Sequence, residues 1–154
     1  MEIERKYLVK SLPNDIDRYE HTEIEQGYLC TSPTLRIRKM GDAYILTVKE
    51  KVISESAAIV NREEEFALTR DKYEALRRKC DGLMVKKTRY RIPISGGLVA
   101  ELDVFHGQHE GLLLVEVEFP SVDDANSFVP PSWFGLNVSA DKRYRNSWLA
   151  FNEA

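Results

Sequence analysis

The chain opens with MEIERKYLVK, residues 1–10, in which charged and apolar side chains alternate. This alternation is typical of a β-strand, where successive side chains point to opposite faces. Glu2, Glu4 and Lys6 would then share one face of the strand, with apolar residues on the other. The stretch therefore predicts a first strand whose charged face either meets bulk water or lines a charged interior.

The composition predicts a single domain covering residues 1–154, with enough apolar residues (43%) for a sizeable core. Charged residues make up 31% of the chain but nearly balance at a net charge of −3, which is not the basic footprint of a DNA-binding protein. No apolar run approaches the ~20 residues of a membrane helix, and Glu2 and Glu4 occupy the place of a positively charged signal region. We therefore expect a cytoplasmic protein that binds neither DNA nor membranes, with Cys30 and Cys80 as free thiols.

Turn-forming residues recur between short alternating runs, which predicts antiparallel strands joined by hairpins. Strands are expected near 1–9, 21–30, 34–40, 43–50, 60–68, 84–94, 98–106 and 112–120, helices near 70–80 and 140–152, and a helical turn near 122–128. Thr69 and Ser139 are placed to cap the two main helices. The stretch 51–59 lacks clean periodicity and is expected to be a loop. His106 and His109 lie in a predicted turn, where we expect them to be solvated.

Most of the predicted strands carry two charges, two residues apart, on one face. The acidic pairs are Glu2 and Glu4, Glu63 and Glu65, Glu101 and Asp103, and Glu116 and Glu118; the bases are Lys6, Arg36, Arg38, Lys49, Lys87, Arg89 and Arg91. Antiparallel sheets commonly keep one face wet, and ion pairs across an open sheet would explain several such rows. A wet face, however, normally mixes neutral polar residues among its charges, and these rows contain almost none.

Eight antiparallel strands can also close into a barrel, which removes the exposed edges. The apolar faces would then point outward, under the helices, and the charged faces inward. Such an interior holds water, because desolvating each unpaired ion costs several kcal/mol. Rows of bases suit phosphate oxygens, and rows of carboxylates suit Mg²⁺ or Mn²⁺. The predicted fold is therefore α+β, an eight-stranded antiparallel barrel with two or three flanking helices.

The ordered set of charge pairs resembles a known family. The opening Glu2-Ile3-Glu4-Arg5-Lys6 is similar to the E-x-E-x-K signature of the CYTH superfamily, the triphosphate tunnel metalloenzymes. The later elements follow in the family's order: Arg36-x-Arg38, Lys49, Glu63-x-Glu65, Lys87-x-Arg89, Glu101-x-Asp103 and Glu116-x-Glu118. The resemblance implies a tunnel that binds triphosphate and a divalent metal. The family includes inorganic tripolyphosphatases, thiamine triphosphatases, RNA triphosphatases and class IV adenylyl cyclases.

The resemblance also implies roles for individual residues. The metal carboxylates would be Glu2, Glu4, Glu116 and Glu118, with Glu63, Glu65 and Asp103 as further acids for a second metal or its water. The triphosphate clamp would be Lys6, Arg36, Arg38, Lys49, Lys87 and Arg89, since the planar fork of arginine meets two phosphate oxygens at once. Lys142 lies in a run that resembles a C-terminal element of short bacterial members and would reach a terminal phosphate, or else be a solvated helix residue.

Tyr28 would join Lys6, Glu63 and Asp103 as a catalytic residue. In short tripolyphosphatase-like members, a tyrosine on the second strand can contact the lysine of the opening signature. Tyr28 and Lys6 fit this arrangement if both face inward. The alternative for Tyr28 is an aromatic residue that packs on its strand.

The expected reaction is metal-dependent hydrolysis of inorganic tripolyphosphate to pyrophosphate and phosphate, since no inserted segment offers to recognise a base or a thiazolium ring. Trp148 belongs to a helix stripe and Trp133 is expected to pack a loop. The alternatives are a nucleoside or thiamine triphosphatase, a class IV adenylyl cyclase, or a non-catalytic module that binds polyphosphate or nucleotide. A homodimer is also plausible, because apolar outer positions such as Leu102 and Val115 need a cover.

Overall fold

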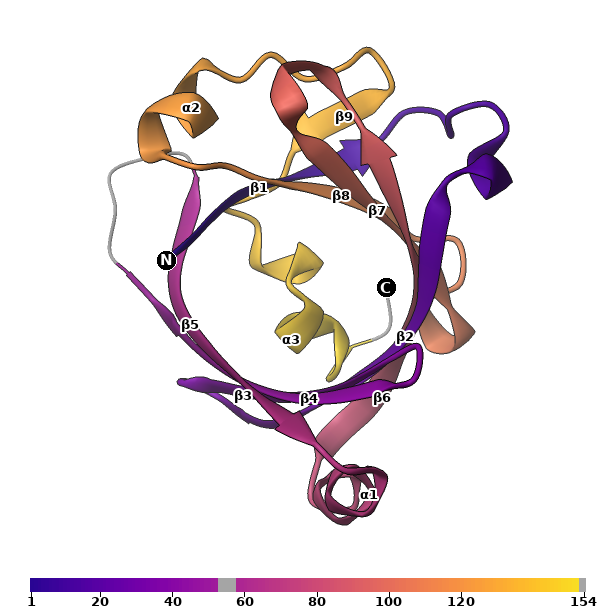
Figure 1. The fold of residues 1–154 in the computed structure, drawn as a ribbon, viewed down its shortest axis with the longest axis vertical. Helices are drawn as coiled ribbons and strands as arrows, with labels where there is room; N and C mark the ends of the chain where they lie inside the picture. Colours follow the sequence, from indigo (N-terminus) through magenta and orange to yellow (C-terminus); the bar gives the residue numbers. More distant parts are fainter. Residues whose placement is uncertain (53–57, 153–154) are drawn as a thin grey trace.

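The computed structural model describes residues 1–52 and 58–152. Within them, antiparallel strands close into an eight-stranded barrel, which confirms the predicted fold (Figure 1). Its strands are β1 (Glu2–Val9), β2 (Glu20–Thr31), β3 (Thr34–Met40), β4 (Ala43–Lys51), β5 (Ile59–Leu68), β6 (Asp81–Pro93), β7 (Val99–His106) and β8 (Leu113–Glu118). They run in the order β5-β4-β3-β2-β6-β7-β8-β1, and pairing between β1 and β5 closes the ring.

Strand β1 closes the barrel by sharing one edge between two partners. Its first residues, Glu2 to Glu4, pair with residues 59–61 of β5. Farther along, from Tyr7 to Val9, it pairs with a short strand, β9 (Phe134–Asn137), which the sequence analysis did not predict. The opposite edge of β1 pairs with β8. The C-terminal part of the chain is thereby brought to one end of the barrel.

In the C-terminal segment of the chain, helical structure is shorter than predicted. Helix α1 (Arg70–Arg77) begins as expected, with the Thr69 side chain accepting a hydrogen bond from the Lys72 N–H, and α2 (Val122–Ser127) follows β8. The expected helix over 140–152 is wrong: a 3₁₀ turn, η4 (Lys142–Tyr144), and α3 (Asn146–Leu149) flank Arg145, whose backbone is extended. Ser139 caps neither, because its hydroxyl accepts the backbone N–H of Lys6 at 2.9 Å.

Short 3₁₀ turns occupy three connections: η1 (Ile16–Arg18), η2 (Ser95–Gly97) and η3 (Gly107–His109). The loop expected over 51–59 is bounded by the end of β4 at Lys51 and the start of β5 at Ile59. Its residues 53–57 lie outside the described residues.

The outer face of β7, β8 and β1 is covered by the chain itself. Leu102, Val115 and Val117 are fully buried in an apolar cluster with Phe119 and Phe134. Residues of α2 and β9 contribute to this cover. The argument for a second subunit over these positions therefore does not hold, and the homodimer stays a prediction.

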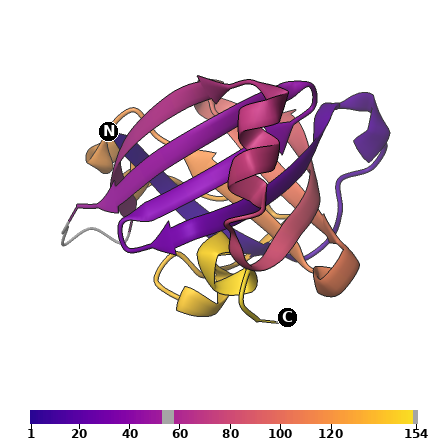
Figure 2. The same ribbon diagram turned by 90° about the horizontal axis from the view of Figure 1, so that it is seen from below.

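A second apolar cluster anchors the C-terminal segment. Leu149 and Ala150 pack with Tyr28, Phe105 and Leu114. His109, predicted to be solvated, is instead buried at 2% exposure, and its Nε2 lies 2.6 Å from the Asn152 carbonyl oxygen. With these anchors, α3 lies across one end of the bore, as the two ribbon views together show (Figures 1 and 2).

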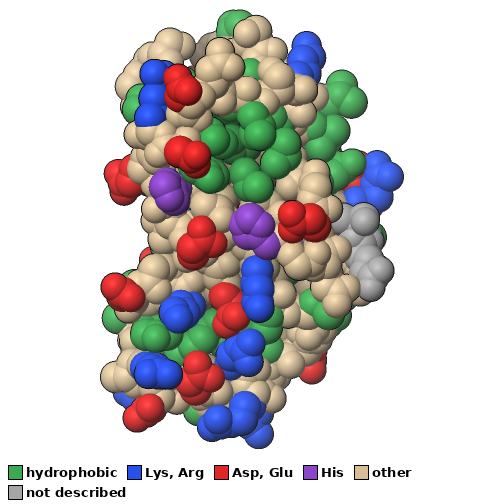
Figure 3. All heavy atoms as spheres, turned by 90° about the vertical axis from the view of Figure 1, so that its right-hand side faces the viewer, with side chains coloured by type: hydrophobic (Ala, Val, Ile, Leu, Met, Phe, Trp, Pro, Cys, Tyr) green, Lys and Arg blue, Asp and Glu red, His purple; other side chains and the backbone are tan. Residues whose placement is uncertain are grey.

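The outer surface mixes charges of both signs. On the face in Figure 3, a hydrophobic patch lies above the histidines, and most of the lysine and arginine side chains lie below them, mixed with acidic ones. Cys30 and Cys80 are both free thiols, as expected. Within the described residues, the helices are too short or too polar to cross a membrane.

Candidate functional site: a charged tunnel

The barrel encloses a cavity of about 1150 Å³ whose wall carries charges of both signs. The predicted site residues that line it are Glu2, Glu4, Lys6, Tyr28, Arg36, Arg38, Lys49, Glu63, Glu65, Lys87, Arg89, Glu116 and Glu118. The ionic faces of the strands thus point inward, as the alternation of residues 1–10 allowed. Asp103 and Lys142 are not among the lining residues.

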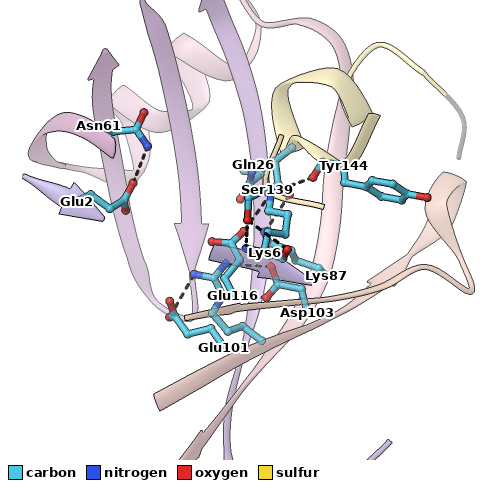
Figure 4. A network of polar contacts seen from close by, with 12 residues as sticks. Glu2, Lys6, Gln26, Asn61, Lys87, Glu101, Asp103, Glu116, Ser139 and Tyr144 are labelled. Atoms are coloured by element: carbon cyan, nitrogen blue, oxygen red, sulfur yellow. Dashed lines mark hydrogen bonds and ion pairs between the residues drawn. The ribbon is translucent and has the colours of Figure 1, made fainter. Parts of the chain in front are cut away.

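One part of the wall holds the acids at the start of β1 together with Lys49. The Lys49 Nζ lies 3.0 Å from a Glu2 carboxylate oxygen and 3.9 Å from one of Glu63. The side-chain amide of Asn61, which the sequence analysis had not singled out, donates to Glu2 at 3.2 Å, away from the Lys6 cluster (Figure 4). Glu65 is among the lining residues and is exposed to solvent.

Deeper in the bore, the pKa values of two neighbouring carboxyl groups, Glu4 and Glu116, are shifted in opposite directions. Burial raises the pKa of Glu4 well above its usual range, and the nearby carboxylates of Glu116 and Glu2 raise it further. Burial also opposes ionisation of Glu116, but neighbouring bases, Lys6 first, hold the pKa of Glu116 well below its usual range. Burial together with nearby acids raises the pKa of Glu118 as well, despite the influence of Lys49. The wall here therefore carries more acid than its bases neutralise.

This excess of carboxyl groups fits a hard divalent cation, which prefers oxygen ligands. The raised pKa of Glu4 reflects like charges crowded away from water, and a bound cation would relieve that crowding. Within the described residues, no three acidic, histidine or cysteine side chains are already gathered around one point. The Lys49 ammonium lies against one Glu2 oxygen, Oε1, which also accepts a hydrogen bond from the Asn61 amide.

The bases of β6 are held by acids on β7. The strand register sets Arg89 opposite Asp103, and the guanidinium donates to both Asp103 oxygens, at 2.8 and 2.9 Å. The Lys87 Nζ lies 2.8 Å from the same carboxylate, and the Lys87 and Asp103 side chains are each only 1% exposed. Arg91 and Glu101 pair at 3.1 Å closer to solvent.

Asp103 thus lies behind the bases and does not face the cavity, so the structure does not place it where a metal ligand was expected. Burial would raise the pKa of Asp103, but Arg89 and Lys87 outweigh burial and lower it. Burial lowers the pKa of Lys87 to about 7, and the positive charges of Arg89 and Arg38 oppose the influence of Asp103. Asp103 therefore fixes the position of Lys87 and Arg89.

The arginines of β3 have no such partners. Arg36 donates to the Thr47 hydroxyl at 3.3 Å, and within the described residues neither Arg36 nor Arg38 has a carboxylate at ion-pair distance. The buried Nε of each also lacks a hydrogen-bond acceptor there. Burial lowers the pKa of Arg38 to about 9, with Arg36 and Arg89 adding to the effect. This wall is an unneutralised positive surface, and an anion would stabilise it.

At the α3 end, the C-terminal segment contacts two of the predicted phosphate-binding lysines. The Lys6 Nζ donates to the Tyr144 carbonyl oxygen at 2.8 Å and lies 3.2 Å from Glu116. The Lys87 Nζ donates to the Asn146 side-chain oxygen at 3.0 Å. The Tyr144 ring itself points away from this cluster (Figure 4).

Tyr28 lines the cavity and also packs in the second apolar cluster, and its catalytic role stays a prediction. Its hydroxyl accepts a hydrogen bond from the Gln26 amide at 2.8 Å. Within the described residues, no direct hydrogen bond joins Tyr28 to Lys6, although both line the same cavity.

Lys142 is exposed and lies on the outside of the barrel, next to Asn137 and Val138. The residues of this segment that line the tunnel are instead Arg145, Asn146 and Ser147, none of which the sequence analysis had singled out. The charge of Arg145 was a possible signal, but a regular helix over 140–152 gave no reason to orient it toward the bore.

Comparisons with known proteins agree with this geometry. The model of the CYTH domain family matches residues 1–125. A curated inorganic triphosphatase from Nitrosomonas europaea is 41% identical over 155 residues, covering 98% of this chain and 97% of that protein. A curated inorganic triphosphatase from Acetivibrio thermocellus is 32% identical, with coverages of 98% and 94%.

Among solved structures, a crystal structure of an inorganic triphosphatase superposes with a TM-score of 0.71 at 40% sequence identity. The match covers 99% of this chain and 95% of that one. The likeness therefore extends through β9 and α3, beyond the region that the family model matches.

Proposed function

Because this chain belongs to the CYTH domain family, we propose that it is a metal-dependent hydrolase that converts inorganic tripolyphosphate to pyrophosphate and phosphate. The observation that carries the proposal is the pair Arg36 and Arg38. Their buried guanidinium groups face a cavity and have no carboxylate partner in the described part of the chain. The relatives that are named inorganic triphosphatases support this choice of substrate.

The bases would bind the substrate and hold it in line for attack. Arg36 and Arg38 offer their planar forks to non-bridging phosphate oxygens. Lys6 and Lys87 would exchange their contacts with Tyr144 and Asn146 for phosphate oxygens. Positioning and electrostatic stabilisation supply most of the catalysis in phosphoryl transfer.

The acids would hold the cation and prepare the water. Glu2, Glu4 and Glu118 fit Mg²⁺ or Mn²⁺, which would neutralise charge on the phosphate oxygens when bound. Glu63 lies 3.9 Å from Lys49 and also interacts with the Glu2 carboxyl group, and its carboxylate would accept a proton from the attacking water. Lys6 and Tyr28 lie at the α3 end and would stabilise the charge of a phosphate bound there.

The lining also supports an inorganic substrate over a nucleotide or a thiamine ester. Among the lining residues that the structure describes, the aromatic side chain is Tyr28, which is only 2% exposed. It leaves little ring face on which a base could stack. Trp148 packs against the second apolar cluster and Trp133 against the first, as the sequence indicated.

The test is phosphate release from tripolyphosphate by the purified protein with Mg²⁺, with Mn²⁺ and with a chelator. We expect release only when a metal is present, and ATP, thiamine triphosphate and pyrophosphate should compete weakly. Faster turnover of ATP or of thiamine triphosphate would favour those triphosphatase functions, and formation of a cyclic nucleotide would favour a cyclase. Tight binding of tripolyphosphate without release in any metal would indicate a non-catalytic module.

The role of Glu4 is tested by Glu4→Gln, which keeps the shape of the side chain and removes its negative charge. We expect turnover to fall by about 100-fold or more, because the cation loses a ligand. The matched control is Glu64→Gln on the outward face of β5, which should retain wild-type rates. Wild-type turnover in purified Glu4→Gln at low metal concentration would refute the assignment.

Two further proposals come from the sequence. A reducing cytoplasm suits the free thiols of Cys30 and Cys80. Light scattering at micromolar concentration would decide between a monomer and the proposed homodimer.

A further inference from the structure

Arg145 occupies a particular place at the α3 end of the tunnel. It follows the residue whose carbonyl oxygen binds Lys6 and precedes the residue whose side chain binds Lys87. Its own side chain is partly buried and lines the tunnel. Three cationic residues, Lys6, Lys87 and Arg145, therefore line the same tunnel, and the segment that carries Arg145 contacts both lysines. Figure 1 shows α3, which follows Arg145, lying across the bore.

The backbone around Arg145 is firmly held. Its carbonyl oxygen accepts the N–H of Leu149 at 3.0 Å, and Leu149 is buried in the second apolar cluster. Beyond α3, the carbonyl oxygen of Ala150 accepts the N–H of Leu83. Arg145 is therefore presented to the tunnel by a segment fixed at several points.

The charge of Arg145 is not neutralised by an ion pair within the part of the chain that the structure describes. Lys6 pairs with Glu116, and Lys87 pairs with Asp103. For the Arg145 guanidinium, no carboxylate lies within ion-pair distance in the described residues. Its neighbour Arg143 differs in both respects: it is exposed outside the barrel and binds Asp141 at 2.7 Å.

We propose that Arg145 is a substrate-binding residue that recognises the terminal phosphate of tripolyphosphate at the α3 end. This inference rests on the proposed function, because it takes the tunnel to be a triphosphate site. A polyphosphate lying along the bore meets α3 with one of its ends, and an unesterified end phosphate carries the most negative charge. Arg145 adds a fork of donors there, beside two lysines that act as point charges.

The experiment compares three variants by steady-state hydrolysis of tripolyphosphate and by calorimetric binding of tripolyphosphate without metal. Arg145→Met removes the charge and keeps much of the length, Arg145→Lys restores a charge, and Arg143→Met is the matched control outside the tunnel. We expect Arg145→Met to raise KM and Kd about tenfold or more, as the loss of a charge-assisted hydrogen bond predicts. The kcat should stay within about twofold, Arg145→Lys should recover part of the loss, and Arg143→Met should match wild type.

A KM and Kd of Arg145→Met within about twofold of wild type would overturn the inference, as would an equal loss in Arg143→Met. If the wild type binds tripolyphosphate but hydrolyses none, the hydrolase proposal fails while the Kd comparison still decides the role of Arg145. If the wild type neither binds nor hydrolyses it, both proposals fail. Equal melting temperatures would confirm that the variants differ in binding and not in folding.

Discussion

Strands β3 and β6 carry the same sequence feature, two bases two residues apart that face the tunnel, yet the two walls differ physically. On β6, Lys87 and Arg89 share the carboxylate of Asp103. On β3, Arg36 and Arg38 have no acidic partner among the described residues. The cause is the neighbouring strand: β6 lies beside the acidic row of β7, whereas β3 lies between β2 and β4, which place Gln26, Tyr28, Ile45 and Thr47 opposite it.

The difference teaches that equal charge patterns can serve different purposes. The β6 bases are positioned by an internal ion pair before any ligand arrives. The β3 arginines are left to pair with a ligand. Burial, with repulsion from Arg36 and Arg89, lowers the pKa of Arg38 to about 9. The predictions that follow test this distinction.

The largest effect is expected on the β6 side, from Asp103→Asn. Removing one partner of a buried ion pair leaves buried charges uncompensated, which costs about 3–5 kcal/mol of unfolding free energy. Urea denaturation measures the loss. Glu101→Gln, whose partners are the half-exposed Arg91 at 3.1 Å and, more weakly, Arg89 at 3.4 Å, should lose less than Asp103→Asn does. If Asp103→Asn keeps wild-type stability and only weakens metal binding, Asp103 is a metal ligand after all.

On the β3 side the loss should appear in catalysis. Arg38→Ala removes a charge that has no carboxylate at ion-pair distance among the described residues, so the melting temperature should change little. Turnover of tripolyphosphate should fall by about 10²–10³-fold, the size found when one donor to a developing charge is removed. Initial rates of phosphate release and a thermal melt on the same sample give both values. A variant that loses stability but keeps its rate would reverse the comparison.

An ion pair on the outside of the barrel gives a comparison for the buried pairs of Asp103, with a smaller expected loss of stability. Glu25 accepts hydrogen bonds from the Tyr73 hydroxyl at 2.9 Å and from Arg77 at 3.1 Å, where α1 packs on the barrel. Because Arg77 is 41% exposed and screened by solvent, Glu25→Gln should cost only about 1 kcal/mol at neutral pH. Urea denaturation of this variant beside Asp103→Asn should show the smaller loss, and an equal loss would contradict the contrast.

The pH dependence of this contact has a definite sign. Burial would raise the pKa of Glu25, but the hydrogen bonds from Arg77 and Tyr73 outweigh burial and lower it. The carboxylate therefore stabilises the fold fully above its unfolded-state pKa, and this contribution is lost as the pH falls through the lower folded-state pKa. The stability gap between wild type and Glu25→Gln should accordingly shrink in acid. A gap that widens there would show the opposite shift.

The barrel itself was predictable, because alternation along each strand fixes which side chains share a face. Glu2 and Glu4, for example, face the bore as their spacing indicated. The ion pairs of Asp103 were not predictable, because a carboxylate beside a base and one beside a metal have the same pattern within one strand. Only the register between β6 and β7, which sets Arg89 opposite Asp103, distinguishes these two possibilities.

The C-terminal segment shows a different limit of sequence reasoning. The spacing of Tyr144, Trp148 and Phe151 predicted a regular helix, but Asp141 caps a 3₁₀ turn and Arg145 interrupts the run with extended backbone. Strand β9 is only four residues long. Its partner, β1, lies at the other end of the chain, and no local pattern could have indicated that pairing. Arg145 was missed because its orientation depends on both features.

The shared edge of β1 has a consequence for how the protein is made. β1 precedes all of its pairing partners in the chain, so its edges stay unpaired until β5, then β8 and finally β9 have been synthesised. Contacts between residues so distant in the chain form slowly. A nascent polypeptide on the ribosome therefore carries its carboxylate and guanidinium rows on separate, unclosed strands. The charged interior is complete only once β5 and β8 have both paired with β1.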